Sequence, residues 1–214
     1  MIAVPEKHIT FTSGNLRLEG RLWLPPVGPS SGVVICHPHP LHGGDMENYV
    51  VRMVAGDLAS RGLAVLRFNF RGVGLSGGVY AGGLGEQEDA RAALEYLASW
   101  DEVAGARLGL CGYSFGGLVA FSVGPQEERV AAIAGISPLL PDHPLSQCLK
   151  PKLFVFGQND QVIPVAEAVA QAQAMPAPRE VVVIPGADHF WWGREMEAAV
   201  KVGEFFAREI GTSG

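Results

Sequence analysis

The chain has 214 residues, of which 48% are hydrophobic and 18% are charged, so it can bury one sizeable core but not two comfortable ones. We therefore expect a single domain over residues 1–214. The net charge of −6 would repel a polyanion, so nucleic acid is not an expected partner.

The first residues lack a basic start followed by an apolar stretch of secretory length, and no run of about 18 apolar residues occurs anywhere. These features predict a cytoplasmic protein with no membrane partner. Cys36, Cys111 and Cys148 are odd in number, and their spacing does not suit a metal site. We expect them to be reduced and buried.

The predicted elements begin with two strands of alternating polarity, residues 8–13 and 16–25, which indicate an antiparallel hairpin at a sheet edge. Short continuous apolar runs follow, as is typical of parallel strands covered on both faces: residues 32–38, 63–70, 107–114, 130–137, 151–157 and 180–186. Helical patterns separate most of these runs: residues 47–61, 86–98, 115–123, 165–174 and 194–209. The sequence therefore predicts a doubly wound, mostly parallel α/β sheet of about eight strands with an antiparallel N-terminal edge hairpin.

Two of the helical patterns indicate which face is buried. Residues 47–61 place four apolar side chains on one face: Val50, Val51, Val54 and Leu58. Residues 194–209 have a predicted inner side made of Met196, Ala199, Val200, Gly203 and Phe206. In residues 86–98, an acidic first turn suits the positive end of a helix dipole.

A serine lies at the turn between the predicted strand 107–114 and the predicted helix 115–123. The local pattern is G-x-S-x-G, with Gly112, Ser114 and Gly116. Glycines two residues before and after the serine remove side chains that would collide where strand and helix nearly touch. This geometry predicts a nucleophile at Ser114, and the competing interpretation is an ordinary serine in a glycine-rich turn.

A serine nucleophile needs a base and an acid that orients the base. Asp160 and His189 each follow a predicted strand, and the chain order of Ser114, Asp160 and His189 places all three at the carboxyl ends of parallel strands. Two other acids remain candidates for the residue that orients His189. Asp142 follows the preceding strand, and Asp188 adjoins the histidine, where a loop-stabilising role is the expected one.

The stretches "HPHP", "RFNFRGVGLSGG", "GYSFGG" and "GADHF" together resemble the α/β-hydrolase superfamily, specifically its small serine esterase-like members without a lid. The resemblance covers nearly the whole chain. It implies a carboxylesterase-like serine hydrolase that cleaves small-molecule carboxylic esters through an acyl-enzyme intermediate and needs no cofactor. In that reaction Ser114 would attack, His189 would accept its proton and Asp160 would orient the imidazole.

The resemblance also implies an oxyanion hole made of two backbone N–H groups. The first is that of Phe115, directly after the serine. The second comes from the loop after the strand 32–38, where Pro38 and Pro40 cannot donate, so His39 is the best-placed donor. Pro38 stands where related hydrolases usually have a glycine, which departs from the family pattern.

Two other features of the sequence have alternative interpretations. His37, His39 and His42 could share a metal ion, although no further cluster of ligands supports this, and His37 is expected to form structural hydrogen bonds beneath the site. The stretch "GVGLSG" (72–77) matches a dinucleotide-binding pattern but lacks the helix and the acid that such a site requires. We interpret residues 71–85 as a loop bordering the pocket.

The segment between the predicted strands 130–137 and 151–157 bears on the substrate. Residues 138–150 are too few for a helical lid domain, which predicts an open site and favours small or accessible esters. Thioesters and activated amides remain alternatives. A different class of function, a ligand-binding protein without catalysis on the same scaffold, also remains open.

Overall fold

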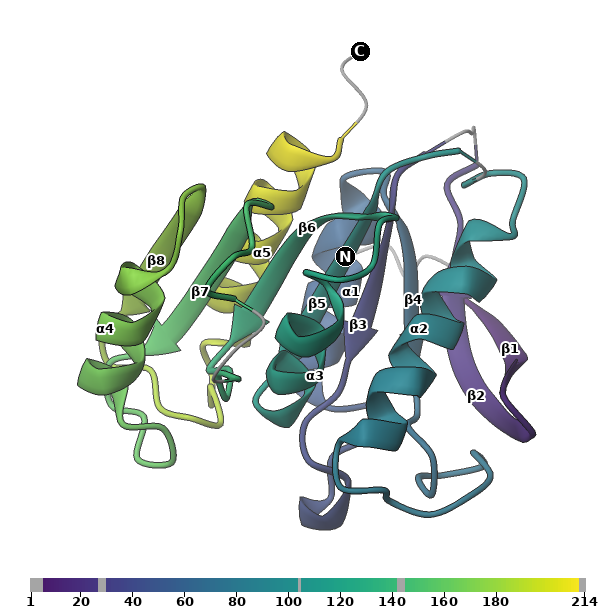
Figure 1. The fold of residues 1–214 in the computed structure, drawn as a ribbon, viewed down its shortest axis with the longest axis horizontal. Coiled ribbons are helices and arrows are strands. Elements are labelled where there is room, and N and C mark those ends of the chain that lie inside the picture. The colour runs from purple at the N-terminus through teal and green to yellow at the C-terminus, as the bar shows by residue number, and fades with distance from the viewer. Residues whose placement is uncertain (1–5, 27–29, 104, 142–144, 212–214) are drawn as a thin grey trace.

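The computed structural model describes residues 6–26, 30–103, 105–141 and 145–211, and its centre is an eight-stranded sheet in the order β1-β2-β4-β3-β5-β6-β7-β8 (Figure 1). The strands are β1 (Lys7–Ser13), β2 (Leu16–Trp23), β3 (Gly32–Cys36), β4 (Ala64–Phe68), β5 (Leu108–Tyr113), β6 (Val130–Ile136), β7 (Lys152–Gly157) and β8 (Arg179–Ile184). The helices are α1 (Tyr49–Ser60), α2 (Leu84–Ala98), α3 (Phe115–Val123), α4 (Val165–Ala174) and α5 (Glu195–Glu209). The predicted fold class is confirmed.

Strand direction divides the sheet into two parts. β1 and β2 pair antiparallel, β2 pairs antiparallel with β4, and all pairs from β4 to β8 in the sheet order are parallel. The carboxyl ends of β3 to β8 therefore lie along one edge. We call the loops and first helical turns that follow these ends the carboxyl edge, and the opposite side of the sheet the amino edge.

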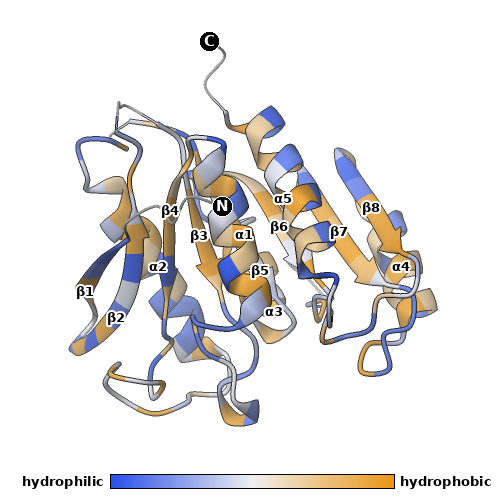
Figure 2. Cartoon of the chain, turned by 180° about the vertical axis from the view of Figure 1, so that it is seen from behind, coloured by the Kyte–Doolittle hydropathy of each residue, from blue (hydrophilic) through white to orange (hydrophobic). Residues whose placement is uncertain are grey.

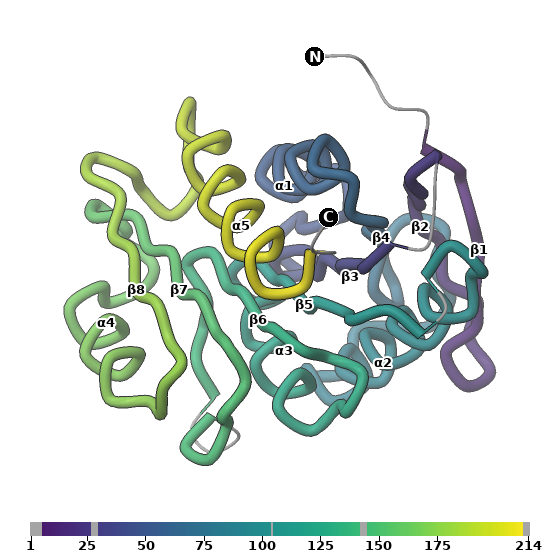
Figure 3. Tube along the Cα trace, turned by 90° about the horizontal axis from the view of Figure 1, so that it is seen from above, coloured from purple at the N-terminus to yellow at the C-terminus, as the bar shows by residue number. Residues whose placement is uncertain are grey.

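Helices cover both faces of the sheet. Seen from above, α1 and α5 lie on one face, and α2, α3 and α4 lie on the other (Figure 3). Each face has its own hydrophobic cluster, for example with Leu58 and Phe206 on the first face and Leu94 and Val119 on the second. The central strands are predominantly hydrophobic because both of their faces are covered (Figure 2).

The helices agree closely with the sequence patterns, with one correction in α5. Its buried side chains are Ala198, Ala199, Val202, Gly203, Phe205 and Phe206. Met196 is 40% exposed and Val200 is half-buried, so the predicted inner side was wrong at these two positions. The physical reason is that the large rings of Phe205 and Phe206 set the rotation of the helix against the sheet, and Met196 then faces away from it.

Polar side chains at the end of β4 hold the following loop. Arg67 pairs with Glu6, Asn69 donates to a buried oxygen of Glu19, and the guanidinium of Arg71 contacts both carboxylate oxygens of Asp89. These hydrogen bonds and ion pairs fix the course of the loop toward α2.

Other expectations concern thiols and membranes. The three cysteines are free and buried, as predicted. Burial raises the pKa of Cys111 to about 12, so this thiol stays protonated at neutral pH. In the described ranges, no helix is long and apolar enough to cross a bilayer.

Candidate active site

Ser114 occupies the sharp turn between β5 and α3. Its backbone has φ 53° and ψ −116°, a conformation that a residue with a side chain adopts only under strain. A Cβ at Gly112 would overlap the carbonyl of Gly116, and a Cβ at Gly116 would overlap the carbonyl of Cys36. Both glycines are thus required by close backbone approach, which is why the sequence can fold into this turn.

The structure brings Ser114, His189 and Asp160 together in one hydrogen-bonded chain. Nε2 of His189 lies 3.1 Å from Oγ of Ser114, and Nδ1 of His189 lies 2.8 Å from Oδ2 of Asp160. Asp160 follows β7 and His189 follows β8, so the adjacency of these parallel strands to one another and to β6 brings their loops to the serine. Ser114 and His189 are buried, with 8% and 6% of their surfaces exposed.

The carboxylate of Asp160 is ionised and fixed. Burial acts to raise its pKa, but the hydrogen bond to His189 and the backbone N–H of Ile163 outweigh burial and hold the pKa below its ordinary value. Oδ1 accepts N–H groups from Val162 at 2.9 Å and Ile163 at 2.8 Å, while Oδ2 faces His189. An ionised carboxylate can only accept, so Nδ1 of His189 donates to it and Nε2 is free to accept from the hydroxyl of Ser114.

Three further residues, which were not predicted from the sequence, hold the hydrogen-bonded chain of Ser114, His189 and Asp160 in place. The hydroxyl of Tyr113 donates to the carbonyl of His189 at 2.7 Å. Ser137, which directly follows β6, hydrogen-bonds Asp160 and accepts the indole N–H of Trp191 at 3.3 Å. Polar residues directly after an apolar run are the signal that could have identified Ser137, whereas the bond of Tyr113 spans 76 residues and has no local signal.

The two residues expected to supply oxyanion-hole donors lie side by side. The rings of His39 and Phe115 have centroids 4.8 Å apart. Among the described residues, neither backbone N–H has a hydrogen-bond acceptor. Nδ1 of His39 accepts the N–H of Leu41 at 3.1 Å and thereby shapes the turn of Pro40–His42 (η1). A backbone N–H without an acceptor in the protein is free to donate to a bound ligand.

His37 has the structural role that the sequence predicted. Its side chain is fully buried, its Nε2 accepts the N–H of Phe70 at 3.1 Å, and its Nδ1 donates to the carbonyl of Pro38 at 2.6 Å. Burial lowers its pKa to about 4, against the weaker effect of the Pro38 bond. His37 is therefore neutral and ties the loop after β3 to the loop after β4.

The sequence offered Asp188 and Asp142 as alternatives to Asp160. Asp188 accepts the N–H of Trp191 at 2.7 Å and so stabilises its loop, as expected. Asp142 lies outside the described residues.

In the part of the chain that the structure describes, no group of three His, Cys, Asp or Glu side chains is arranged to hold a metal ion. Trp191 is buried and packs in the core, while Trp192 is 71% exposed.

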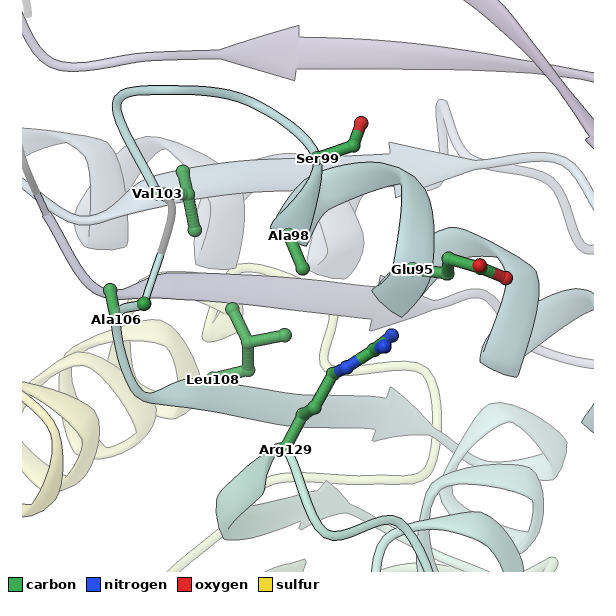
Figure 4. A pocket seen from close by; sticks show the side chains of 8 residues that line it. Glu95, Ala98, Ser99, Val103, Ala106, Leu108 and Arg129 are labelled. Atoms are coloured by element: carbon green, nitrogen blue, oxygen red, sulfur yellow. The ribbon is translucent and has the colours of Figure 1, made fainter.

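One cavity lies far from Ser114. It has a volume of about 520 Å³ and is lined by Glu95, Ala98, Ser99, Val103, Gly105, Ala106, Leu108 and Arg129 (Figure 4). Leu108 begins β5 and Ser114 follows its end, so about 20 Å of extended strand separates the cavity from the serine. The cavity belongs to the amino edge and contains none of the predicted site residues.

Two family profiles match the chain. That of the Dienelactone hydrolase family matches residues 84–203, which include Ser114, Asp160 and His189. That of the X-Pro dipeptidyl-peptidase (S15 family) matches residues 13–143.

Individual proteins are similar over most of their length. An alpha-beta serine hydrolase homologue from Coxiella burnetii is 34% identical, with a TM-score of 0.83 over 92% of this chain and 96% of that one. The protein XC6422 from Xanthomonas campestris, described as an a/b serine hydrolase without lid, is 26% identical, with a TM-score of 0.87 over 100% and 99%. The protein RP471 of Rickettsia prowazekii is 30% identical over 210 residues, 92% of this chain and 87% of that protein.

Proposed function

The chain belongs to the α/β-hydrolase superfamily, and we propose that within it the protein is a serine hydrolase that cleaves small carboxylic esters through an acyl-enzyme intermediate. The proposal assigns Ser114 as nucleophile, His189 as general base and acid, and Asp160 as the residue that orients His189. The single observation that carries it is the hydrogen-bonded chain from Ser114 through His189 to Asp160.

The reaction proceeds in two halves. In the first, Oγ of Ser114 attacks the carbonyl carbon while Nε2 of His189 takes the hydroxyl proton. The N–H groups of Phe115 and His39 stabilise the negative oxygen of the tetrahedral intermediate. The bond to the alcohol then breaks, and His189 returns the proton to the departing oxygen.

In the second half, water takes the place of the alcohol. His189 accepts a proton from the water as its oxygen attacks the acyl-enzyme, and it then protonates Oγ of Ser114 as the acid departs. The ionised Asp160 stabilises the imidazolium that forms in both halves and keeps the proton of Nδ1 in place. The chemistry of the three side chains needs no other group.

Two considerations favour an ester over an amide. The family profile that includes all three proposed residues is named for the hydrolysis of a lactone, which is a cyclic ester. The profile of the peptidase family ends at residue 143, before Asp160 and His189. The proposal also includes an open site without a lid domain, based on the short link 138–150, of which residues 142–144 lie outside the described part.

The test combines a covalent probe with turnover. A fluorophosphonate should label the wild-type protein at Ser114, and p-nitrophenyl butyrate should be hydrolysed. Ser114→Ala should abolish labelling and reduce kcat by at least ~10⁴-fold without changing the fold. Ser122→Ala, on the buried side of the same helix, is the matched control and should keep both activities. A Ser114→Ala protein as active as the wild type would overturn the proposal.

A further inference from the structure

Large exposed hydrophobic side chains gather at one edge of the molecule. In the described part of the chain there are 12 such side chains, and 10 of them lie in the carboxyl edge. The exceptions are Leu149, before β7, and Val183, within β8. Exposed apolar area contributes nothing to folding, and two of these side chains, Phe190 and Trp192, closely follow His189 in the chain, where a ligand at the site can cover them.

The charges of the same edge are already paired. The guanidinium of Arg71 is held by Asp89, and that of Arg194 by Glu197. Arg52, in the first turn of α1, lies within 4.0 Å of Glu47. A carboxylate on a substrate would thus meet no free cation from these segments, which favours an uncharged substrate.

The proposed reaction fixes where the alcohol part of an ester lies. Nε2 of His189 returns the proton to the departing oxygen, so this oxygen and the group attached to it must lie beside the imidazole. Phe190 has an exposed aromatic ring beside that imidazole, whereas the other ring next to it, that of Tyr113, is buried. The ring centroid of Phe190 lies 5.6 Å from that of His189, the planes are at 89°, and 57% of Phe190 is exposed.

Phe190 is presented by a fixed backbone. His189 is held by Tyr113 through its carbonyl, and Trp191 is held by Asp188 through its N–H and by the core through its buried indole. The backbone of Phe190 is therefore held between these anchors, with its ring in contact with the imidazole. An aromatic ring held open beside a proton donor is arranged to contact a ligand.

We propose that Phe190 is a specificity-determining residue whose exposed ring contacts the alcohol part of an uncharged ester and selects apolar alcohols. This inference rests on the proposed function, because it uses the proton transfer by His189. Covering the exposed part of a phenyl ring with an apolar group is worth about a tenfold or greater gain in kcat/KM.

The experiment varies the alcohol and the acyl group separately. kcat/KM is measured for methyl butyrate and benzyl butyrate, and for methyl acetate and methyl hexanoate, with wild type, Phe190→Ala and Phe190→Leu. Phe190→Ala should lower the benzyl-to-methyl ratio about tenfold and leave the hexanoate-to-acetate ratio within twofold. Phe190→Leu should restore part of the benzyl preference. Leu149→Ala changes an exposed apolar side chain at the amino edge and should change neither ratio.

The other outcomes show whether the inference about Phe190 or the proposed function itself is wrong. An equal loss on methyl and benzyl esters would show that the ring merely supports His189, and a loss that follows acyl length would place the ring against the acyl group; both overturn the inference, as does an unchanged ratio. In all three cases, fluorophosphonate labelling of Ser114 would leave the proposed function intact. Absence of labelling and of ester hydrolysis in the wild type would overturn both.

Discussion

The carboxyl edge and the amino edge of the sheet differ in how much strain and exposure they carry. Among the described residues, the non-glycine residues with positive φ are Ser114 (53°), Ser137 (39°) and Trp191 (62°), and all three lie in the carboxyl edge. The amino edge has the cavity of about 520 Å³, and its lysines are satisfied by ordinary structural contacts, as when Lys152 donates to the carbonyls of Pro176 and Pro178.

In this protein, cavity volume and backbone strain therefore indicate opposite edges of the sheet. The strained residues at the carboxyl edge are the nucleophile candidate, the serine that bonds Asp160, and the tryptophan that bonds that serine. Strain of this kind costs roughly 1–3 kcal/mol per residue and persists only where the surroundings enforce it. Its coincidence with the Ser114–His189–Asp160 chain marks the edge where function is to be sought.

The largest expected effect separates the two neighbouring acids of the carboxyl edge. Asp160→Asn should lower kcat on p-nitrophenyl butyrate by ~10³-fold or more, because an amide can donate to Nδ1 and hold the wrong tautomer of His189. Asp188→Asn keeps an acceptor for the N–H of Trp191 and should stay within about threefold.

The same measurement of kcat tests Asp188 and Asp142 as the acid that orients His189. A large loss in Asp188→Asn with a small one in Asp160→Asn would reverse the assignment. A large loss confined to Asp142→Asn would move the acid to a residue outside the described part of the chain.

The second effect is a pH dependence of stability from the buried His37. Its pKa of about 4 lies below the ordinary 6.5, so between these values the unfolded chain binds a proton that the native protein does not. This contribution to the free energy of unfolding is complete above pH 6.5 and is lost as the pH falls toward 4. By pH 5 the loss amounts to about 2 kcal/mol.

Urea unfolding at pH 7 and pH 5 measures this loss directly. His37→Gln should remove most of the difference between the two pH values, whatever its effect at pH 7. His42→Gln, which changes an exposed histidine of the same loop, should retain the difference. An unchanged pH dependence in His37→Gln would show that His37 is not the titrating group.

The third effect tests the strain at the serine. Ser114→Gly and Ser114→Ala should both be inactive, but the glycine variant should be more stable by about 1 kcal/mol because glycine adopts φ 53° without strain. At Ser122, within α3, the order should reverse by a similar amount, because glycine weakens a helix interior. Thermal unfolding of the four variants gives the comparison, and the same order at both positions would contradict strain at Ser114.

The smallest effect is expected at the amino edge. Ala98→Leu places a larger side chain in the cavity of Figure 4 and should leave kcat/KM within about twofold, because about 20 Å of strand separates that space from Ser114. A loss of more than tenfold, with unchanged thermal stability, would break the distinction between the two edges.

Much of the fold could be predicted because its signals are local. The apolar runs gave each strand of the parallel sheet to within a few residues, and the periodicity of residues 115–123 and 165–174 matched α3 and α4 at both ends. The turn at Ser114 was predictable for the same reason, since Gly112 and Gly116 lie within two residues of it. The catalytic roles of Ser114, Asp160, His189, Phe115 and His39 stay predictions that the experiments above address.

Two other features were not predicted, the first although its contacts are local and the second because its cause is distant. The helix α2 begins at Leu84 because Glu86 folds back to the N–H groups of Ala81 and Gly83, so the expected start at residue 86 was two residues late. The exposure of Met196 depends on how α5 rotates against the sheet, which residues far away in the chain decide. The spacing of hydrophobic residues within 194–209 does not by itself determine how α5 is rotated.

By itself, the sequence determined the order of strands and helices, the turn that presents Ser114, and the set of acids that follow parallel strands. Only the tertiary structure decided that Asp160 faces His189 and that the hydroxyl of Tyr113 holds the carbonyl of His189. The physical reason is range. Backbone propensity and periodicity act over a few residues, whereas the contacts of this site join residues 29 to 76 positions apart through the register of neighbouring strands.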